Sequence, residues 1–289
     1  MPDKTVILHN DMLSLAVAPL GAEMQYLRTA AGADVLWHGD PAFWSGRSPV
    51  LFPIVGRAVE DTIAVGDHSA PMPQHGFARR SLFELVEASA QRSRHRLTDT
   101  DESRAFYPFA FSLDVTHELV ESTLNVDVQV TNNSATPMPF GFGFHPAFNW
   151  PLPAAGGRVH HVTLAGAGAP DRVELHDGLL RRTPVAGPFV QGDLEIAEDL
   201  FAEGAMVFPN GADALRYGPQ DGSALTFEFR NLPDLALWRP KGAPFLCIEP
   251  WHGTASYVGD GPQIAQRPNS IVLEAGDVAN FGYSVTVHA

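Results

Sequence analysis

Four short segments place polar or ionisable side chains beside apolar stretches bounded by Gly and Pro, and these side chains could perform chemistry. In segment 48–57 (SPVLFPIVGR) an apolar run ends on Arg57. A guanidinium group at that point could hold a polar ligand through paired hydrogen bonds. Most arginines stay solvated, so a surface position just past the end of a strand is the simpler interpretation of Arg57 taken alone.

Two histidines have surroundings that suit ligand binding. In segment 74–80 (QHGFARR), Gly76 leaves space beside His75 for another backbone or a ligand. In segment 140–150 (FGFGFHPAFNW), His145 is the one ionisable group among aromatic and small residues, a composition that suits a sugar pocket. A loop histidine without a partner remains the alternative for His75, and a satisfied core histidine in an edge strand remains the alternative for His145.

The fourth segment, 243–252 (APFLCIEPWH), carries a carboxylate at the end of an apolar run. Burial of Glu249 is costly unless the charge is used or paired, so a catalytic role and a structural salt bridge are both open. Glu249 and Trp251 point to the same face if the strand continues through Pro250. Two histidines, an arginine and a glutamate could together perform general acid and base catalysis on a polar, uncharged substrate.

The elements that must position these residues are predicted to be β-strands. The 26 glycines and 24 prolines fall between short runs in which apolar residues alternate with polar ones. In the clearest run, residues 123–130 (TLNVDVQV), every second side chain is apolar, which predicts one core face and one solvent face. Similar runs occupy residues 13–17, 112–119, 225–229, 270–273 and 283–287.

Helical signals are few. Residues 99–107 supply capping residues and one or two amphipathic turns before Pro108, and residues 195–202 could form a second short helix. The stretch 151–170, rich in Gly, Ala and Pro, is interpreted as a long loop. The pattern predicts an all-β protein, a large antiparallel sandwich that forms a single domain over residues 1–289.

Composition excludes several classes of protein. With 19 Lys and Arg against 33 Asp and Glu, the net charge of −14 argues against non-specific binding of nucleic acid. The one cysteine, Cys247, cannot form an internal disulfide, which suggests a reducing compartment. No basic and apolar leader begins the chain and no apolar run is long enough to span a bilayer, so we expect a cytoplasmic protein without membrane contact.

Taken together, the motifs LFPIVGR, QHGFAR, FHPAFNW and CIEPWHG resemble those of the aldose 1-epimerase (galactose mutarotase-like) family, and more closely its LacX-like branch. The resemblance extends from about residue 4 to the C-terminus. It implies a β-supersandwich with a concave face that binds a sugar. It also implies an isomerase that interconverts the α and β anomers of free or phosphorylated aldoses by opening and reclosing the ring, with no cofactor and no metal.

The resemblance also implies roles for individual residues. Glu249 matches the base that takes the proton of the C1 hydroxyl, and His145 matches the acid that protonates the ring oxygen O5. His75 matches a second histidine near O5, and Arg57 matches an arginine that holds sugar hydroxyls. The acid and the base are then expected to titrate near neutrality. The acidic net charge favours a charged imidazole at His145 and burial among neighbouring phenylalanines opposes it, so the sign of the net pKa shift stays open. Trp251 is a further candidate for contact with the substrate.

One position departs from the family pattern. Relatives carry a substrate-binding Asp where this chain has Glu203 and Gly204, so either Glu203 replaces it or the contact is lost, which would change the preferred sugar.

The arginines leave open whether the sugar is phosphorylated. Arg79, with Arg57 and Arg80, could bind a 6-phosphate. The acidic net charge argues weakly against that, and free aldoses are slightly favoured.

Three other classes compete with this interpretation. His75, His145 and Glu249 could form a metal triad of two histidines and a carboxylate, although the histidines lie far apart in the sequence without an H-x-H motif. A catalytically silent sugar-binding protein on the same fold is the main alternative. A glycoside hydrolase would need a second carboxylate, which the motifs do not provide. Exposed strand edges are compatible with a monomer or a homodimer.

Overall fold

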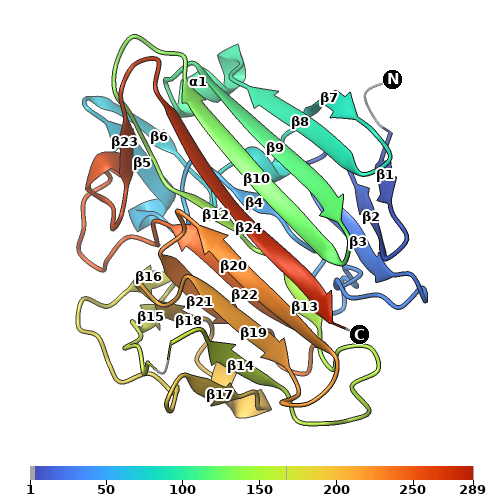
Figure 1. Ribbon diagram of the computed structural model, residues 1–289. Coiled ribbons are helices and arrows are strands. Elements are labelled where there is room, and N and C mark those ends of the chain that lie inside the picture. The colour runs from blue at the N-terminus through green and yellow to red at the C-terminus, as the bar shows by residue number, and fades with distance from the viewer. Residues whose placement is uncertain (1–3, 167, 289) are drawn as a thin grey trace.

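The protein is built almost entirely from antiparallel β-sheets, as shown by a computed structural model that describes residues 4–166 and 168–288 (Figure 1). The largest sheet has nine strands and crosses the whole molecule. From one edge to the other its strands are β17 (Asp193–Glu195), β14 (His161–Leu164), β19 (Ala214–Gly218), β20 (Ala224–Arg230), β24 (Val278–His288), β10 (Thr123–Asn132), β9 (Phe111–Val120), β8 (Arg92–Thr98) and β7 (Glu84–Ala88).

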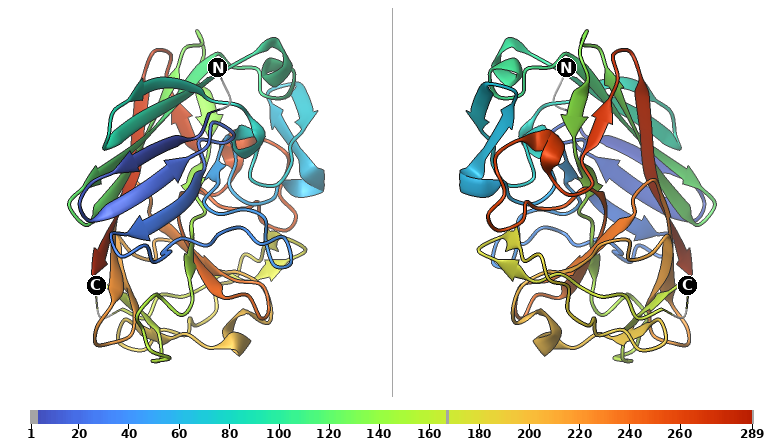
Figure 2. Two further views of the ribbon diagram at one scale, coloured as in Figure 1. Left: turned by 90° about the vertical axis from the view of Figure 1, so that its right-hand side faces the viewer. Right: turned by 90° about the vertical axis from the view of Figure 1, so that its left-hand side faces the viewer.

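The remaining sheets lie behind the nine-stranded sheet, as the two side views show (Figure 2). The second largest is ordered β18 (Met206–Phe208), β21 (Asp234–Trp238), β22 (Phe245–His252), β12 (Phe142–Phe144) and β4 (Val50–Leu51), and β13 (Ala147–Asn149) also pairs with β22. A three-stranded sheet consists of β1 (Val6–His9), β2 (Leu13–Val17) and β3 (Met24–Thr29). Three two-stranded sheets pair β5 (Thr62–Val65) with β6 (His68–Pro71), β11 (Met138–Phe140) with β23 (Ile271–Leu273), and β15 (Leu175–His176) with β16 (Leu179–Leu180).

The alternating runs of the sequence form strands as predicted. In β10 the four apolar side chains from Leu124 to Val130 are buried, whereas Asp127 and Gln129 on the other face are exposed. The runs at 13–17, 112–119, 225–229 and 283–287 coincide with or lie inside β2, β9, β20 and β24, and the run at 270–273 becomes β23. The all-β antiparallel sandwich is therefore confirmed, while its extent as a single domain stays a prediction.

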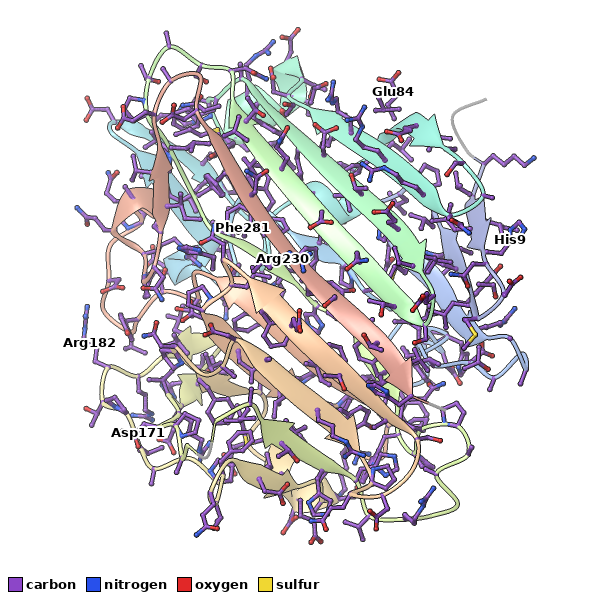
Figure 3. The ribbon with its side chains drawn as sticks, viewed as in Figure 1. His9, Glu84, Asp171, Arg182, Arg230 and Phe281 are labelled. Atoms are coloured by element: carbon purple, nitrogen blue, oxygen red, sulfur yellow. The ribbon has the colours of Figure 1, made fainter. Side chains whose placement is uncertain are left out.

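A close approach across β24 requires the glycine at its centre. Gly282 pairs with Asp127 of β10 on one side and with Arg230 of β20 on the other. The Arg230 Nη2 and Asp127 Oδ1 atoms lie 2.7 Å apart, so their salt bridge passes over Gly282. A Cβ atom there would lie 2.5 Å from Arg230 Nη2 and 2.9 Å from the Val126 carbonyl oxygen, and the backbone oxygen cannot move aside as a guanidinium can. Figure 3 labels Arg230 beside β24, next to Phe281 of that strand.

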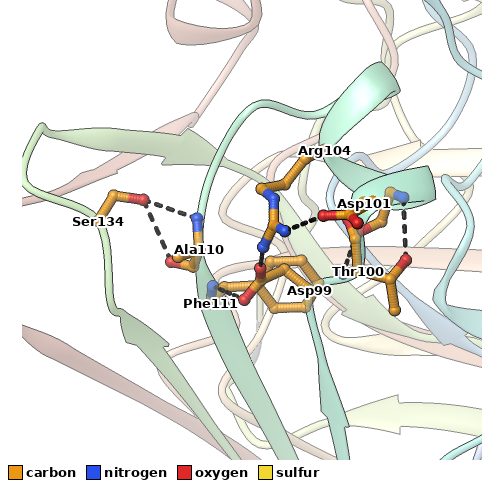
Figure 4. Close-up of polar contacts among 8 residues, drawn as sticks. Asp99, Thr100, Asp101, Arg104, Ala110, Phe111 and Ser134 are labelled. Atoms are coloured by element: carbon orange, nitrogen blue, oxygen red, sulfur yellow. Dashed lines mark hydrogen bonds and ion pairs between the residues drawn. The ribbon is translucent and has the colours of Figure 1, made fainter.

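The predicted helix before Pro108 is present as α1 (Asp101–Phe106). Thr100 caps it, because its hydroxyl accepts from the Ser103 N–H at 3.1 Å while the Ser103 hydroxyl accepts from the Thr100 N–H at 2.8 Å. Arg104 pairs with Asp99 and Asp101, and Asp99 also accepts from the backbone of β9 at its start (Figure 4). The sequence signal for this helix was local, and the structure confirms it.

Two other segments differ from their predicted structure. Residues 195–202 contain no α-helix but a single 3₁₀ turn, η3 (Glu198–Phe201); the other 3₁₀ turns are η1 (Val59–Asp61), η2 (Ala78–Arg80) and η4 (Ile264–Gln266). The prediction of a loop throughout 151–170 was wrong, because β14 pairs there with β17 and β19. In β14 only Val162 and Leu164 are buried, so its alternation is too short to stand out from the Gly- and Ala-rich flanks.

No helix among the described residues is long and apolar enough to cross a bilayer.

Candidate active site

The six-strand assembly around β22 has two different faces, and the candidate catalytic residues lie on the one that faces away from the main core. In β22 the side chains of Leu246 and Ile248 belong to the main hydrophobic core. Side chains that point to the opposite face of β22, including those of Cys247 and Trp251, belong to two smaller buried clusters instead. Glu249 points to the same face as Cys247 and Trp251 and lies between those clusters along the strand. The strand continues through Pro250, so Glu249 and Trp251 share a face as the sequence predicted.

An open cavity of about 470 Å³ lies over this face. Its lining includes five of the predicted residues, His75, Arg79, His145, Glu249 and Trp251. Glu203 also lines the cavity, so the residue that stands near the position of the family's substrate-binding Asp reaches the site. The remaining lining residues are Trp44, Gly56, Gln74, Leu175, Asp177, Gly178, Leu180, Gly204, Ala205, Val207, Trp238 and Ala255.

Glu249 and His145 are in direct contact. The His145 Nε2 and Glu249 Oε2 atoms lie 3.2 Å apart, and both side chains are buried. His145 follows β12, and its backbone N–H donates to the Pro49 carbonyl at 3.1 Å. The Trp44 ring stacks on the imidazole at 4.8 Å between ring centroids, and the Trp238 ring meets it edge-on. These contacts fix the imidazole plane against the carboxyl group.

Burial decides where the proton of this pair resides. Desolvation raises the pKa of the Glu249 carboxyl well above its ordinary value and lowers the pKa of His145 to about 3. Both shifts favour a protonated carboxyl group beside a neutral imidazole, so Glu249 and His145 share one exchangeable proton. The sequence left open the sign of the pKa shift of His145, and burial is the largest cause of the shift in the structure, because the aromatic surroundings exclude the water that would solvate an imidazolium.

His75 is held in a single orientation beside this pair. The His75 ring Nδ1 accepts a hydrogen bond from the Gly56 N–H at 3.1 Å, and the His75 backbone N–H donates to the Gly56 carbonyl at 2.9 Å. An accepting Nδ1 places the ring proton on Nε2, which faces the Gln74 side-chain amide at 3.2 Å, and the Gln74 amide must then present its oxygen to accept that proton. Burial and the neighbouring cations hold the pKa of His75 well below its usual range. The His75 and His145 rings meet edge-on at 5.6 Å between centroids.

The backbone around His75 is unusual. His75 has a φ of 66°, which is uncommon for a residue with a side chain and is found mainly where surrounding contacts enforce it. The next residue, Gly76, lies so close to the 52–53 backbone that a Cβ atom would be 2.2 Å from the Phe52 carbonyl oxygen. The glycine that the sequence analysis associated with close approach therefore contacts another backbone segment.

Arg267, which the sequence analysis missed, holds the segment that orients His75. Its guanidinium is buried and donates to the carbonyl groups of Val55, Arg57 and Thr254 at 2.6, 3.3 and 3.0 Å, and to the Ser256 hydroxyl at 2.6 Å. Two of these carbonyls flank Gly56. Burial lowers the pKa of Arg267 to about 10, which still leaves it charged. No local pattern marks it, because it lies in an ordinary QRP turn.

The two predicted substrate-binding arginines have different positions. Arg79 lines the cavity, and its Nη2 donates to the Gln74 carbonyl at 2.8 Å. Arg57 is absent from the lining: its guanidinium forms a paired salt bridge with Asp61, with both N–O distances 2.8 Å, and donates to the Asp177 carbonyl at 3.0 Å. Asp61 raises the pKa of Arg57 further. Arg57 thus supports the 177–178 turn at the cavity rim, and direct contact with a sugar stays a prediction.

Sequence reasoning also missed four lining residues: Trp44, Gln74, Asp177 and Trp238. Trp238 had a detectable signal, since it alternates with Ala236 in β21 and so shares its face. Trp44 and Asp177 lie outside alternating runs, in loops whose path only the fold determines. The aromatic rings of Trp44, Trp238 and Trp251 give the cavity apolar faces on which a sugar ring could lie.

The metal triad considered for the sequence is not the group that the structure assembles. Among residues 4–166 and 168–288, the set close enough to hold an ion is His145, Cys247 and Glu249, with one ligand atom from each within 4.8 Å of the others. His75 is not part of that set. Cys247 lies two residues before Glu249 on the same face of β22 and is buried.

Comparison with known proteins agrees with the fold and the motifs. The family model for aldose 1-epimerase matches residues 4–286. The chromosomal protein LacX of Lactococcus lactis subsp. lactis is 27% identical over 299 residues, covering 98% of this chain and 99% of LacX.

Two solved structures are also similar. A galactose mutarotase related enzyme from Lactobacillus acidophilus has a TM-score of 0.93 at 26% identity, covering 99% of this chain and 98% of its own. A galactose mutarotase-like protein from Lactobacillus casei has a TM-score of 0.90 at 27% identity, covering 99% and 100%. A model that spans nearly every residue, together with motifs that converge on one cavity, shows that this chain belongs to the aldose 1-epimerase family.

Proposed function

We propose that this protein is an active aldose 1-epimerase that interconverts the α and β anomers of an aldose. The observation that carries the proposal is the buried contact between Glu249 and His145 at 3.2 Å on the floor of an open cavity. The pair holds one proton that either member can carry. General acid and base catalysis at one sugar carbon requires such a pair, with one group to accept a proton and the other to donate one.

Ring opening would follow from moving that proton through the substrate. The reactive form has an ionised Glu249 and a protonated His145. Glu249 takes the proton of the C1 hydroxyl, the C1–O1 bond becomes a carbonyl, the C1–O5 bond breaks, and His145 gives its proton to O5. The step leaves a protonated carboxyl and a neutral imidazole, which is the form that burial favours. Opening therefore relieves the cost of separated charge in a buried site.

Ring closure reverses the same transfers on the other face of the aldehyde. After rotation about the C1–C2 bond, His145 takes the proton of the O5 hydroxyl, O5 attacks C1, and Glu249 returns its proton to the carbonyl oxygen. In this proposal the His75 Nε2–H exchanges its contact with the Gln74 side chain for a hydrogen bond to the sugar near His145. His75 is held neutral, so it acts as a fixed donor and not as a second acid.

The charges around the cavity favour an uncharged aldose over an aldose phosphate. Among the lysines and arginines of the described residues, Arg79 alone lines the cavity. Arg57, the other candidate, is paired with Asp61 and is not part of the lining. Three acidic residues, Asp177, Glu203 and Glu249, line the same space. A phosphate dianion would meet more negative than positive groups there.

The decisive measurement is the optical rotation of freshly dissolved α-D-glucose and α-D-galactose. Wild type is expected to accelerate mutarotation above the spontaneous rate, and Glu249→Gln should lose at least about a hundredfold of that acceleration because it removes the base. Glu195→Gln is the matched control, since Glu195 is an exposed residue at the end of β17 that does not line the cavity.

If wild type does not accelerate either sugar, exchange NMR on glucose 6-phosphate tests the phosphorylated substrate. Silence on that substrate as well would contradict the proposed activity and would favour a sugar-binding protein without catalysis.

A further inference from the structure

The floor of the cavity brings together a thiol, an imidazole and a carboxyl group, although the proposed reaction uses only the last two. The ligand atoms of His145, Cys247 and Glu249 all lie within 4.8 Å of one another. Each of the three residues is at least nine-tenths buried. Of the two ring nitrogens of His145, Nε2 faces Glu249 Oε2 at 3.2 Å, so Nε2 is the nitrogen that could bind an ion together with that carboxylate.

The three donors suit a thiophilic divalent cation. Zn²⁺ takes thiolate, imidazole and carboxylate ligands at about 2.0–2.3 Å in a tetrahedral arrangement, which places ligand atoms roughly 3.3–3.8 Å apart. The side chains would therefore have to move by about an ångström or less each from their present positions. A zinc ion with one thiolate and one carboxylate carries no net charge, so its burial costs less than that of either anion alone.

The backbone positions support the same geometry. Cys247 and Glu249 are alternate residues of β22 and project from one face of that strand, and β13 and β21 pair with Cys247 on either side. His145 lies at the end of β12, which is also paired to β22. Glu249 and His145 line the cavity, so an ion could enter from there.

We propose that His145, Cys247 and Glu249 form a binding site for Zn²⁺ and that the bound ion inhibits the enzyme. The inhibitory part rests on the proposed function. Zn²⁺ would take the place of the proton that Glu249 and His145 share, and without that proton the pair can neither accept from C1–OH nor donate to O5. Cys247 has no part in the reaction and gives the site its preference for a thiophilic ion over Mg²⁺ or Ca²⁺.

The site can be tested without any measurement of activity. Co²⁺ substitutes for Zn²⁺ in such sites, and a thiolate bound to Co²⁺ gives a near-ultraviolet charge-transfer band. The full-length chain, free of a histidine tag and stripped with a chelator, is titrated with Co²⁺. We expect the charge-transfer band to saturate at one ion per chain and to disappear when Zn²⁺ is added.

Three variants locate the site. Cys247→Ala should abolish the band, and His145→Ala should weaken Co²⁺ binding by at least about a hundredfold, since even loss of a group that only supports a metal ligand costs up to that much. His75→Asn is the control and should keep the band, because His75 is outside the group. Cys247→Ser repeats the test with a side chain of similar size, and thermal melting confirms that each variant folds. No band in wild type, or an unchanged band in both Cys247 variants, would overturn the site.

A second measurement tests inhibition. Zn²⁺ should slow mutarotation by wild type, and a chelator should restore the rate. Cys247→Ala should be active without metal and should need at least about a hundredfold more Zn²⁺ for the same loss. If Zn²⁺ accelerates wild type, or inhibits wild type and Cys247→Ala equally, the inhibitory role is wrong. If the protein has no mutarotase activity, the Co²⁺ band still decides the metal site on its own.

Discussion

Glycines set the shape of the candidate site at two points where a side chain would collide with a neighbouring segment, once with backbone and once with a candidate site residue. Gly76 permits the 52–53 backbone to approach the residue after His75. Gly143 of β12 lies against the Trp251 indole, and a Cβ atom there would be 2.4 Å from Trp251 Cδ1. Neither contact involves the substrate directly. Both show that the positions of the candidate residues depend on small neighbours as much as on their own types.

Gly143→Ala should weaken substrate binding by displacing the Trp251 indole from the cavity wall. We expect KM for the aldose to rise several-fold with a smaller change in kcat, because Glu249 and His145 stay in contact. Gly141→Ala is the matched control, since its Cβ would have no neighbour closer than 3.5 Å. Saturation kinetics by polarimetry measure both constants. An equal change in KM for the two variants would contradict a specific role for the Gly143 contact.

At the scale of elements, the site depends on two segments, 55–57 and 254–256, that a single buried arginine joins. Arg267 donates to backbone carbonyls of both segments, and Gly56 between two of those carbonyls fixes His75. We regard Arg267 as a positioning residue, because it acts on the site through the backbone and does not line the cavity.

Arg267→Met should lower kcat and destabilise the protein together. Each carbonyl left without a donor costs about 1–3 kcal/mol of unfolding free energy, so we expect a loss of at least about 2 kcal/mol. Nitrogen NMR of His75 should show a mixture of ring tautomers in place of the Nε2–H form. A purely structural role would lower stability and leave the tautomer unchanged.

Arg158→Met controls for the Arg267 variant. Arg158 also donates to three backbone carbonyl groups, those of Ala154, Ala155 and Asp221, but it lies outside the cavity lining. This variant is expected to lose stability and to keep both kcat and the tautomer of His75.

The same elements show how far the sequence could be interpreted. Alternation in β10 and β22 predicted which side chains share a face, because a strand has a fixed period of two. Helix α1 was predictable because its capping residues are local in sequence. Arg267 and Trp44 were not predictable, since their roles arise from contacts with residues distant in the chain. The paired arrangement of Arg57 with Asp61 was missed for another reason: the motif identifies a cation but not its partner.

At the scale of the whole molecule, the nine-stranded sheet buries ionisable groups that have no part in the site. His95 of β8 and His117 of β9 both lie on the core face, near β1, which packs against these strands. Neither ring nitrogen of His95 has a hydrogen-bond partner, and the neighbouring Ser93 hydroxyl has none either. Burial lowers the pKa of His95 to about 4 and that of His117 to about 3.

These two histidines should make the protein sensitive to acid. Both are neutral in the folded state down to about pH 4, whereas the unfolded chain protonates them from about pH 6.5 downward. The unfolded state therefore binds more protons as the pH falls from 6.5 to 4, and each histidine removes up to about 1.4 kcal/mol of unfolding free energy per pH unit in that window. Above pH 6.5 both states are neutral and the effect vanishes.

Replacing His95 by Leu should therefore stabilise the fold more at pH 5 than at pH 8. The apolar side chain removes two unsatisfied nitrogens at both pH values, but only at pH 5 does it also remove a proton-binding site of the unfolded chain. Urea unfolding of wild type and His95→Leu at the two pH values measures the difference. His68→Leu, at an exposed position of β6, provides the control for loss of a histidine without burial. A stabilisation by His95→Leu that is the same at both pH values would show that the buried imidazole is not what limits stability in acid.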